Sequence, residues 1–137
     1  LEKIGTRVHM TTKIPILGKI SAGYPLYAVE DIIGYTYGDY NEGFDYFALL
    51  VEGDSMNAAQ INEGSIIIVR KQACVDDGDV AVVLIGDDTT VKRVYRSDSI
   101  LTLMPQSTNP AHKPQIYDIN KDRVRILGKV IEVKIKI

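Results

Sequence analysis

The pattern of hydrophobic and polar positions along the 137-residue chain is dominated by short apolar runs separated by small and polar residues. Runs of about four to eight apolar residues between turn residues indicate buried strands, and alternating runs indicate half-exposed strands. We expect strands at residues 14–20, 44–51, 65–70, 79–85, 89–95 and 100–104. Many short strands with few helical signals predict a mostly β fold.

The segments between these runs carry weaker signals. Gly86-Asp87-Asp88 predicts a hairpin turn between the fourth and fifth runs. Residues 21–25, which contain small side chains and a proline, indicate a loop. Residues 28–33 favour one or two helical turns, and residues 35–43, rich in Tyr, Gly and Asp, indicate an irregular loop.

Composition sets the size and setting of the domain. Residues 1–13 are polar and aperiodic, which predicts a linker or arm before one domain at residues 14–137. The net charge of −2 argues against nucleic-acid binding by charge alone. No apolar run approaches the roughly 20 residues that span a bilayer, so we expect no membrane association. A single cysteine, Cys74, fits a reducing cytoplasm.

A serine that follows the predicted strand at residues 44–51 is the first candidate for chemistry. The sequence Glu52-Gly53-Asp54-Ser55-Met56 would place the Ser55 hydroxyl at a tight strand-to-helix turn. Free backbone N–H groups at such a turn can stabilise an oxyanion. A serine that only caps a helical turn produces the same pattern, so the motif alone does not establish a nucleophile.

A lysine inside an apolar strand pattern is the second candidate. If Val91 and Arg93 share one face of the strand, Lys92 lies on the other face with Thr90 and Val94. A buried lysine is costly unless it becomes neutral, and a neutral lysine is a competent general base. The alternative is an ordinary lysine on a solvated strand face.

A loop of small residues, Ser21-Ala22-Gly23-Tyr24, precedes both motifs. A small side chain followed by glycine lets extended backbone enter a narrow cleft, although a simple turn would have the same composition. In order and spacing, the three motifs closely resemble the LexA family of self-cleaving proteins, which includes lambdoid phage repressors and the UmuD mutagenesis proteins. That family carries an Ala–Gly or Cys–Gly cleavage site, then a Gly-x-Ser-Met serine, then a Val-Lys-Arg lysine.

The resemblance runs from about Ile16 to the end of the chain. Further matching segments lie at residues 62–69, 77–83 and 103–110. Ser65 departs from the pattern, because family members often carry Asp at that place. The resemblance implies a fold like that of LexA and signal peptidases, with twisted antiparallel sheets and short helical turns.

The resemblance also implies a mechanism. Ser55 would be the nucleophile and Lys92 its general base, a known variant of serine activation by an adjacent base. The oxyanion donors would be the backbone N–H groups of Asp54 and Ser55. The bond cut would be Ala22–Gly23, within a cleavage loop at residues 20–25 of the same chain. No cofactor and no metal enter this chemistry.

The partners are likewise implied by the resemblance. The chain would be the C-terminal domain of a homodimeric transcriptional repressor that inactivates itself in the SOS response to DNA damage. Its trigger would be a RecA filament or an antirepressor, and DNA would be bound only by a helix-turn-helix domain upstream of residue 1. The alternating residues Val133, Ile135 and Ile137 predict a strand that either pairs across a two-fold axis or packs into the core.

Other functions fit parts of the pattern. The chain could be a UmuD-like polymerase accessory protein, or a non-cleaving domain for dimerisation and effector binding. Because it does not begin with Met, we expect a fragment of a longer repressor. A signal-peptidase-like enzyme would need a membrane anchor. Clustered carboxylates favour solvated turns over a cation site, because their spacing is unlike an EF-hand loop; they lie at positions 76, 77, 79, 87 and 88.

Overall fold

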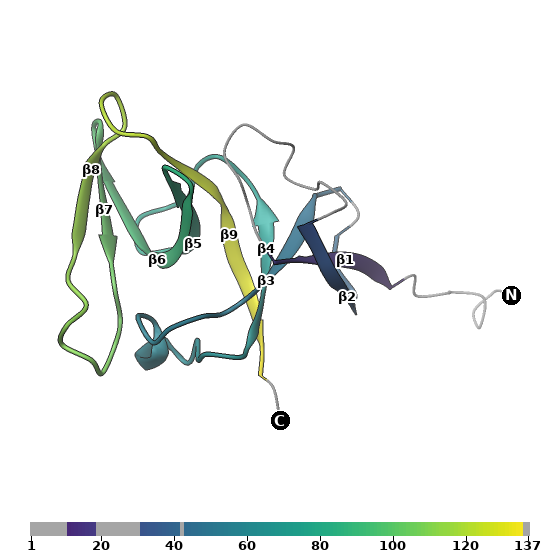
Figure 1. Cartoon of the computed structure of the whole chain (residues 1–137). Coiled ribbons are helices and arrows are strands. Elements are labelled where there is room, and N and C mark those ends of the chain that lie inside the picture. The colour runs from purple at the N-terminus through teal and green to yellow at the C-terminus, as the bar shows by residue number, and fades with distance from the viewer. Residues whose placement is uncertain (1–10, 19–30, 42, 136–137) are drawn as a thin grey trace, which may run out of the picture.

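One mixed sheet of nine strands makes up most of the computed structural model, which describes residues 11–18, 31–41 and 43–135 (Figure 1). The strands are β1 (Thr12–Leu17), β2 (Ile32–Gly38), β3 (Tyr46–Leu50), β4 (Ile66–Lys71), β5 (Val80–Ile85), β6 (Asp88–Ser97), β7 (Ile100–Met104), β8 (Gln115–Asp118) and β9 (Val124–Lys134). A short 3-10 helix, η3 (Asn57–Ala59), lies between β3 and β4. The mostly β fold is confirmed.

The strand order is β2-β1-β3-β4-β9-β5-β6-β7-β8. Neighbouring strands are antiparallel except β1 and β3, which are parallel. The predicted hairpin is present as β5 and β6, joined at Gly86 and Asp87. The apolar runs at 44–51, 65–70 and 100–104 are confirmed as β3, β4 and β7.

Strand β2 corrects two expectations. The irregular loop predicted at residues 35–43 is wrong, because Ile32–Gly38 forms a strand antiparallel to β1. The helical turns predicted at 28–33 are wrong for Ile32 and Ile33, and residues 28–30 lie outside the described residues. Glycines at both ends of the Gly34–Gly38 stretch weaken the local strand signal. Pairing with β1 supplies the hydrogen-bond partners that local sequence does not reveal.

Strand β9 joins the two halves of the sheet, which are formed by β1 to β4 and by β5 to β8. It pairs with β4 on one side and with β5 on the other, with a register shift in each ladder. Figure 1 shows β9, in yellow, running between these two strands. Gly128 lies where the backbones are closest, since a Cβ there would be 2.4 Å from the Arg70 carbonyl oxygen. A glycine is therefore required at this crossing.

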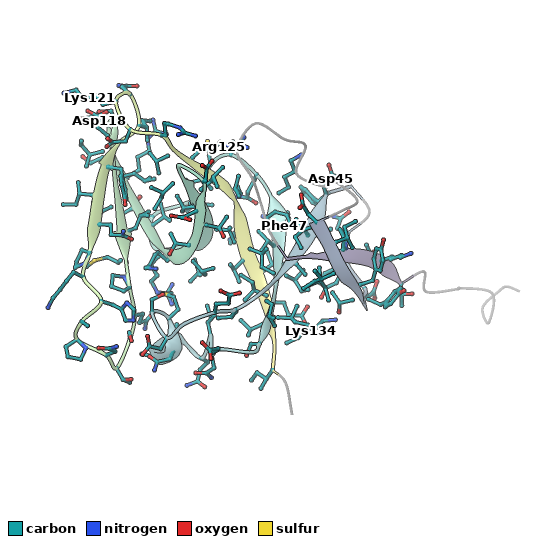
Figure 2. The ribbon with its side chains drawn as sticks, viewed as in Figure 1. Asp45, Phe47, Asp118, Lys121, Arg125 and Lys134 are labelled. Carbon is teal, nitrogen blue, oxygen red and sulfur yellow. The ribbon has the colours of Figure 1, made fainter. Side chains whose placement is uncertain are left out.

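The end of β9 also contacts the β1–β2 hairpin. Lys134 Nζ donates hydrogen bonds to Thr36 Oγ1 at 2.9 Å and to the Tyr37 carbonyl at 2.7 Å, and Figure 2 shows it beside the hairpin. Val133 packs against the core, whereas Ile135 is 63% exposed. Ile137 lies outside the described residues. The apolar face predicted for this strand therefore divides between core and surface.

Three apolar clusters fill the interior. The largest lies beneath the segment that carries Ser55 and draws residues from both halves of the sheet: Leu17, Phe47, Leu49, Val51, Met56, Ile61, Ile67, Val69, Val82, Leu84 and Leu127. A second cluster lies among β5, β6 and β7, and a third among β1, β3 and β4. Within the described ranges, no helix has the length and apolar character to cross a membrane.

Candidate active site

The turn that carries Ser55 is fixed by two nearby residues, Gly53 and Met56. Gly53 has a φ of +81°, a conformation that side chains disfavour, and its N–H donates to Glu63 Oε1 at 2.9 Å. Met56 is only 2% exposed and anchors the far side of the turn in the core. Ser55 between them is half-buried. The predicted turn after β3 is present, and η3 is its only helical element.

Strand β6 brings Lys92 to this turn. Lys92 is 7% exposed, and Val94 on the same face is fully buried, as the strand periodicity predicts. Lys92 Nζ lies 3.0 Å from Ser55 Oγ and 2.5 Å from Thr90 Oγ1. The amine is therefore held between two hydroxyl groups, and the two predicted residues lie within hydrogen-bond distance of each other.

Burial changes the acid–base behaviour of the lysine. Removal of the ammonium from water disfavours the charged form, so burial lowers the pKa of Lys92 below its ordinary value. A neutral amine at this position can accept the proton of Ser55 while it donates to Thr90. The arrangement thus meets the two needs of a general base, reach and a reduced pKa.

The carbonyl groups of the turn are hydrogen-bonded. The Asp54 carbonyl accepts from Ser107 Oγ at 2.7 Å and from the Asn57 N–H at 3.3 Å, and the Ser55 carbonyl accepts from the Gln106 N–H at 2.9 Å. Among the described residues, the N–H of Ser55 has no acceptor. The N–H of Asp54 is hydrogen-bonded to its own carboxylate. The resemblance to the LexA family implies these two groups as oxyanion donors.

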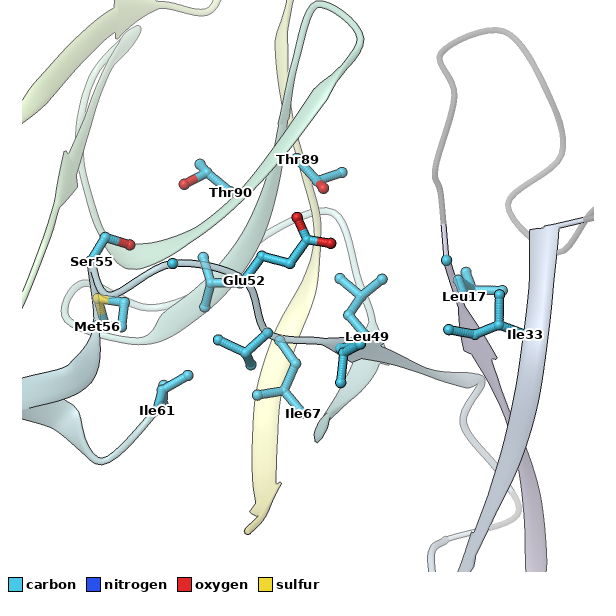
Figure 3. Close-up of a pocket in the computed structure, with 15 residues that line it drawn as sticks. Leu17, Ile33, Leu49, Glu52, Ser55, Met56, Ile61, Ile67, Thr89 and Thr90 are labelled. Carbon is cyan, nitrogen blue, oxygen red and sulfur yellow. The ribbon is translucent and has the colours of Figure 1, made fainter. Parts of the chain in front are cut away.

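A cleft of about 260 Å³ leads to the serine. Most of the residues that line it are apolar and come from several strands, but polar groups are exposed in the walls as well, including those of Glu52, Ser55, Thr89 and Thr90. Figure 3 shows Leu17 and Ile33 on one side of the pocket and Ser55 and Thr90 on the other. Such a cleft suits an extended peptide with small side chains.

Sequence reasoning missed part of this site. Thr90 lies two residues before Lys92 on the same face of the strand. This spacing is the sequence signal that could have indicated its contact with the lysine. The contact between His112 Nε2 and Asp54 Oδ1, at 2.5 Å, joins residues 58 positions apart and has no local signature. Ala22 and Gly23 lie outside the described residues. In the described part of the chain, no three potential ligands gather into a metal site.

Comparisons with known proteins identify the family of the chain. Residues 15–131 match the family described as Peptidase S24-like. The chain belongs to this family. The S24 domain is of the serine peptidase kind and LexA-like, as the motifs predict.

Individual relatives support the same assignment. The LexA repressor of Oleidesulfovibrio alaskensis is 41% identical over 120 residues, which cover 86% of the S24 chain and 56% of the relative. The LexA repressor of Magnetococcus marinus is 40% identical over 122 residues, covering 88% and 52%. That of Geotalea uraniireducens is 42% identical over 121 residues, covering 87% and 59%. The chain thus spans about half the length of the curated relatives it matches.

Proposed function

We propose that this S24 domain is the self-cleaving part of a LexA-like transcriptional repressor and that it cuts its own Ala22–Gly23 bond. The observation that carries the proposal is the 3.0 Å separation of Lys92 Nζ and Ser55 Oγ at the end of a cleft. A serine hydroxyl with a buried amine in reach is the minimum apparatus for nucleophilic attack on a peptide carbonyl.

In the proposed reaction, neutral Lys92 takes the proton of Ser55 as Oγ attacks the Ala22 carbonyl carbon. The N–H groups of Asp54 and Ser55 stabilise the negative oxygen of the tetrahedral intermediate. Protonated Lys92 then gives its proton to the Gly23 nitrogen as that bond breaks. Water hydrolyses the remaining ester, which frees Ser55 and leaves Ala22 with a carboxylate.

The position of the cleft favours cleavage within one chain. Leu17 and Gly18 at the end of β1, and Ile33 at the start of β2, line the same cleft as Ser55. The segment that carries Ala22 and Gly23 therefore leaves and re-enters the described structure at the cleft wall. A substrate attached so close to the nucleophile is present at high effective concentration.

The biological setting is proposed by analogy with the relatives, which are named LexA repressors. On this proposal, cleavage inactivates a homodimeric cytoplasmic repressor in the DNA-damage response. A RecA filament or an antirepressor would act as trigger by binding the cleavable form more tightly than the resting form. DNA binding would belong to a helix-turn-helix domain upstream of residue 1.

The direct test is incubation of the purified chain at alkaline pH, followed by mass measurement. We expect two fragments, residues 1–22 and 23–137. Ser55→Ala and Lys92→Ala should each abolish cleavage, because one removes the nucleophile and the other its base. Ser97→Ala, a matched change of an exposed serine on β6, should cleave normally. If the Ser55→Ala protein still cut between Ala22 and Gly23, the proposal would be wrong.

A further inference from the structure

The loop between β7 and β8, residues 105–114, packs against the turn that carries Ser55, although the proposed chemistry does not use it. The N–H of Gln106 donates to the Ser55 carbonyl at 2.9 Å. The Gln106 carbonyl accepts from the N–H of Ala58, also at 2.9 Å, and Ser107 Oγ donates to the Asp54 carbonyl at 2.7 Å. The loop is thus hydrogen-bonded to the backbone of Asp54, Ser55 and Ala58.

The bond from Ser107 has a geometric consequence at the nucleophile. The carbonyl of Asp54 and the N–H of Ser55 belong to one planar peptide group, and every peptide bond described is trans. In a trans peptide these two groups point in opposite directions. Ser107 supplies the shorter of two hydrogen bonds to this carbonyl, at 2.7 Å against 3.3 Å from the Asn57 N–H. Because these bonds hold the carbonyl on one side, the N–H of Ser55 is directed to the other side.

The Ser107 hydroxyl is itself fixed in place. It accepts a hydrogen bond from the Asn109 N–H at 3.0 Å, so it is held while it donates to Asp54. The Asp54 carboxylate is gripped by the same loop, through His112 Nε2 at 2.5 Å and Asn109 Nδ2 at 3.3 Å. These hydrogen bonds lower the pKa of Asp54, and the bond with His112 has the larger effect. The residue before the nucleophile is therefore held at both its side chain and its carbonyl.

We propose that Ser107 is a positioning residue for self-cleavage, whose hydroxyl aims the N–H of Ser55 at the oxyanion that forms on the Ala22 carbonyl. The inference rests on the proposed function. A donor aimed before the reaction begins needs no reorganisation when charge develops on the substrate oxygen. Ser107 touches neither the scissile bond nor Lys92, and it acts only through the Asp54–Ser55 peptide.

The test compares first-order self-cleavage rates of the full chain across alkaline pH. Ser107→Ala should slow cleavage by about tenfold or more, less than the loss of about a hundredfold to a thousandfold on removing an oxyanion donor outright, because the N–H is misdirected and not deleted. Ser107→Thr keeps a hydroxyl and should return the rate to within about threefold of the unchanged chain. The midpoint of the pH profile should stay constant, since Lys92 is untouched.

Thr108→Val is the matched control. It removes a hydroxyl from the same loop, one that accepts from Asn57 Nδ2 at 2.9 Å. Thr108 reaches the Asp54 carbonyl only indirectly, through Asn57, whose N–H bonds that carbonyl at 3.3 Å. We expect its rate to fall by less than about threefold. Equal losses of cleavage rate in Ser107→Ala and Thr108→Val, or no recovery of the rate in Ser107→Thr, would mean that Ser107 only stabilises the loop. Either result would overturn the inference. A chain without substitutions that does not cut would overturn the proposed function first.

Discussion

The amine of Lys92 lies between two hydroxyl groups, with Ser55 on one side and Thr90 on the other. When neutral, it can donate to Thr90 and keep its lone pair for the Ser55 proton. A protonated amine has no lone pair and can only donate. In the proposed mechanism, the ionisation state of this one side chain therefore decides whether the serine is activated.

The pH dependence of cleavage follows from that condition. Burial lowers the pKa of Lys92 from its ordinary value of 10.5, so the neutral form gains population at a lower pH than in an exposed lysine. Below the folded pKa, the neutral fraction, and with it the cleavage rate, should rise by about tenfold per pH unit and then level off. Timed gel samples over a pH series would measure the curve.

A rate that stayed flat from neutral to alkaline pH would contradict a lysine base. Lys92→Arg serves as control, because arginine keeps the positive charge but stays protonated across the same range. It should show no cleavage at any of these pH values.

At the residue level, local sequence motifs indicate the proposed nucleophile and base but not the groups around them. Ser55 and Lys92 stand in short local motifs, and the apolar pattern of β6 correctly places Lys92 on the buried face. Ser107 and His112 reach the turn from more than fifty positions away. No local pattern encodes such a contact, because it depends on how β7 and the loop after it are placed by the whole sheet.

At the scale of elements, strand β6 carries an ionisable group on its core-facing side. Thr90, Lys92 and Val94 alternate along this face, and a lysine there interrupts what would otherwise be an apolar stripe. The proposed site thus places a buried amine where an apolar side chain would pack better. This is a common relation between activity and stability.

We expect Lys92→Met to raise the free energy of unfolding at neutral pH. Below the folded pKa, Lys92 is protonated in both states, and burial of its charge costs stability in full. As pH rises from the folded pKa toward 10.5, the folded chain loses the proton before the unfolded chain does, and this cost disappears. The gain from Lys92→Met should therefore be largest at neutral pH and shrink in alkaline solution.

Urea unfolding of Ser55→Ala with and without Lys92→Met would measure this gain, since neither protein can cut itself. Lys121→Met, in the same background, replaces an exposed lysine and should leave the midpoint in place. A Lys92→Met midpoint equal to the parent at neutral pH would mean that burial of Lys92 costs nothing.

The elements themselves were unequally predictable. Strands with both faces buried, such as β4 and β5, have continuous apolar runs and are evident in the sequence. The edge strand β8 is largely exposed, so it lacks that signal. The sequence indicates strand β9 only at its end, where the alternation of apolar and polar residues includes Val133. Farther back, a register shift in each ladder breaks the alternation, and the strands on both sides supply the pairing that the local pattern does not indicate.

At the scale of the whole molecule, the proposed nucleophile and base belong to different halves of the sheet. Ser55 follows β3, in the half formed by β1 to β4, and Lys92 lies on β6, in the half formed by β5 to β8. These halves are adjacent in the sheet only through β9, which lies between β4 and β5. The largest apolar cluster also needs residues from both halves and from β9.

Because β9 follows β1 to β8 in the sequence, the order of synthesis affects when the proposed site can form. A ribosome that has finished β8 has already made the proposed nucleophile, the proposed base and the bond proposed to be cut. It has not yet made the strand that brings the first two together. We expect ribosome-arrested chains that end before Val124 to keep Ala22–Gly23 intact, and released full-length chains to cut it under the same alkaline conditions. Cleavage of the arrested chains would show that the halves meet without β9. Intact arrested chains would mean that the chain cannot cut itself before β9 has been synthesised.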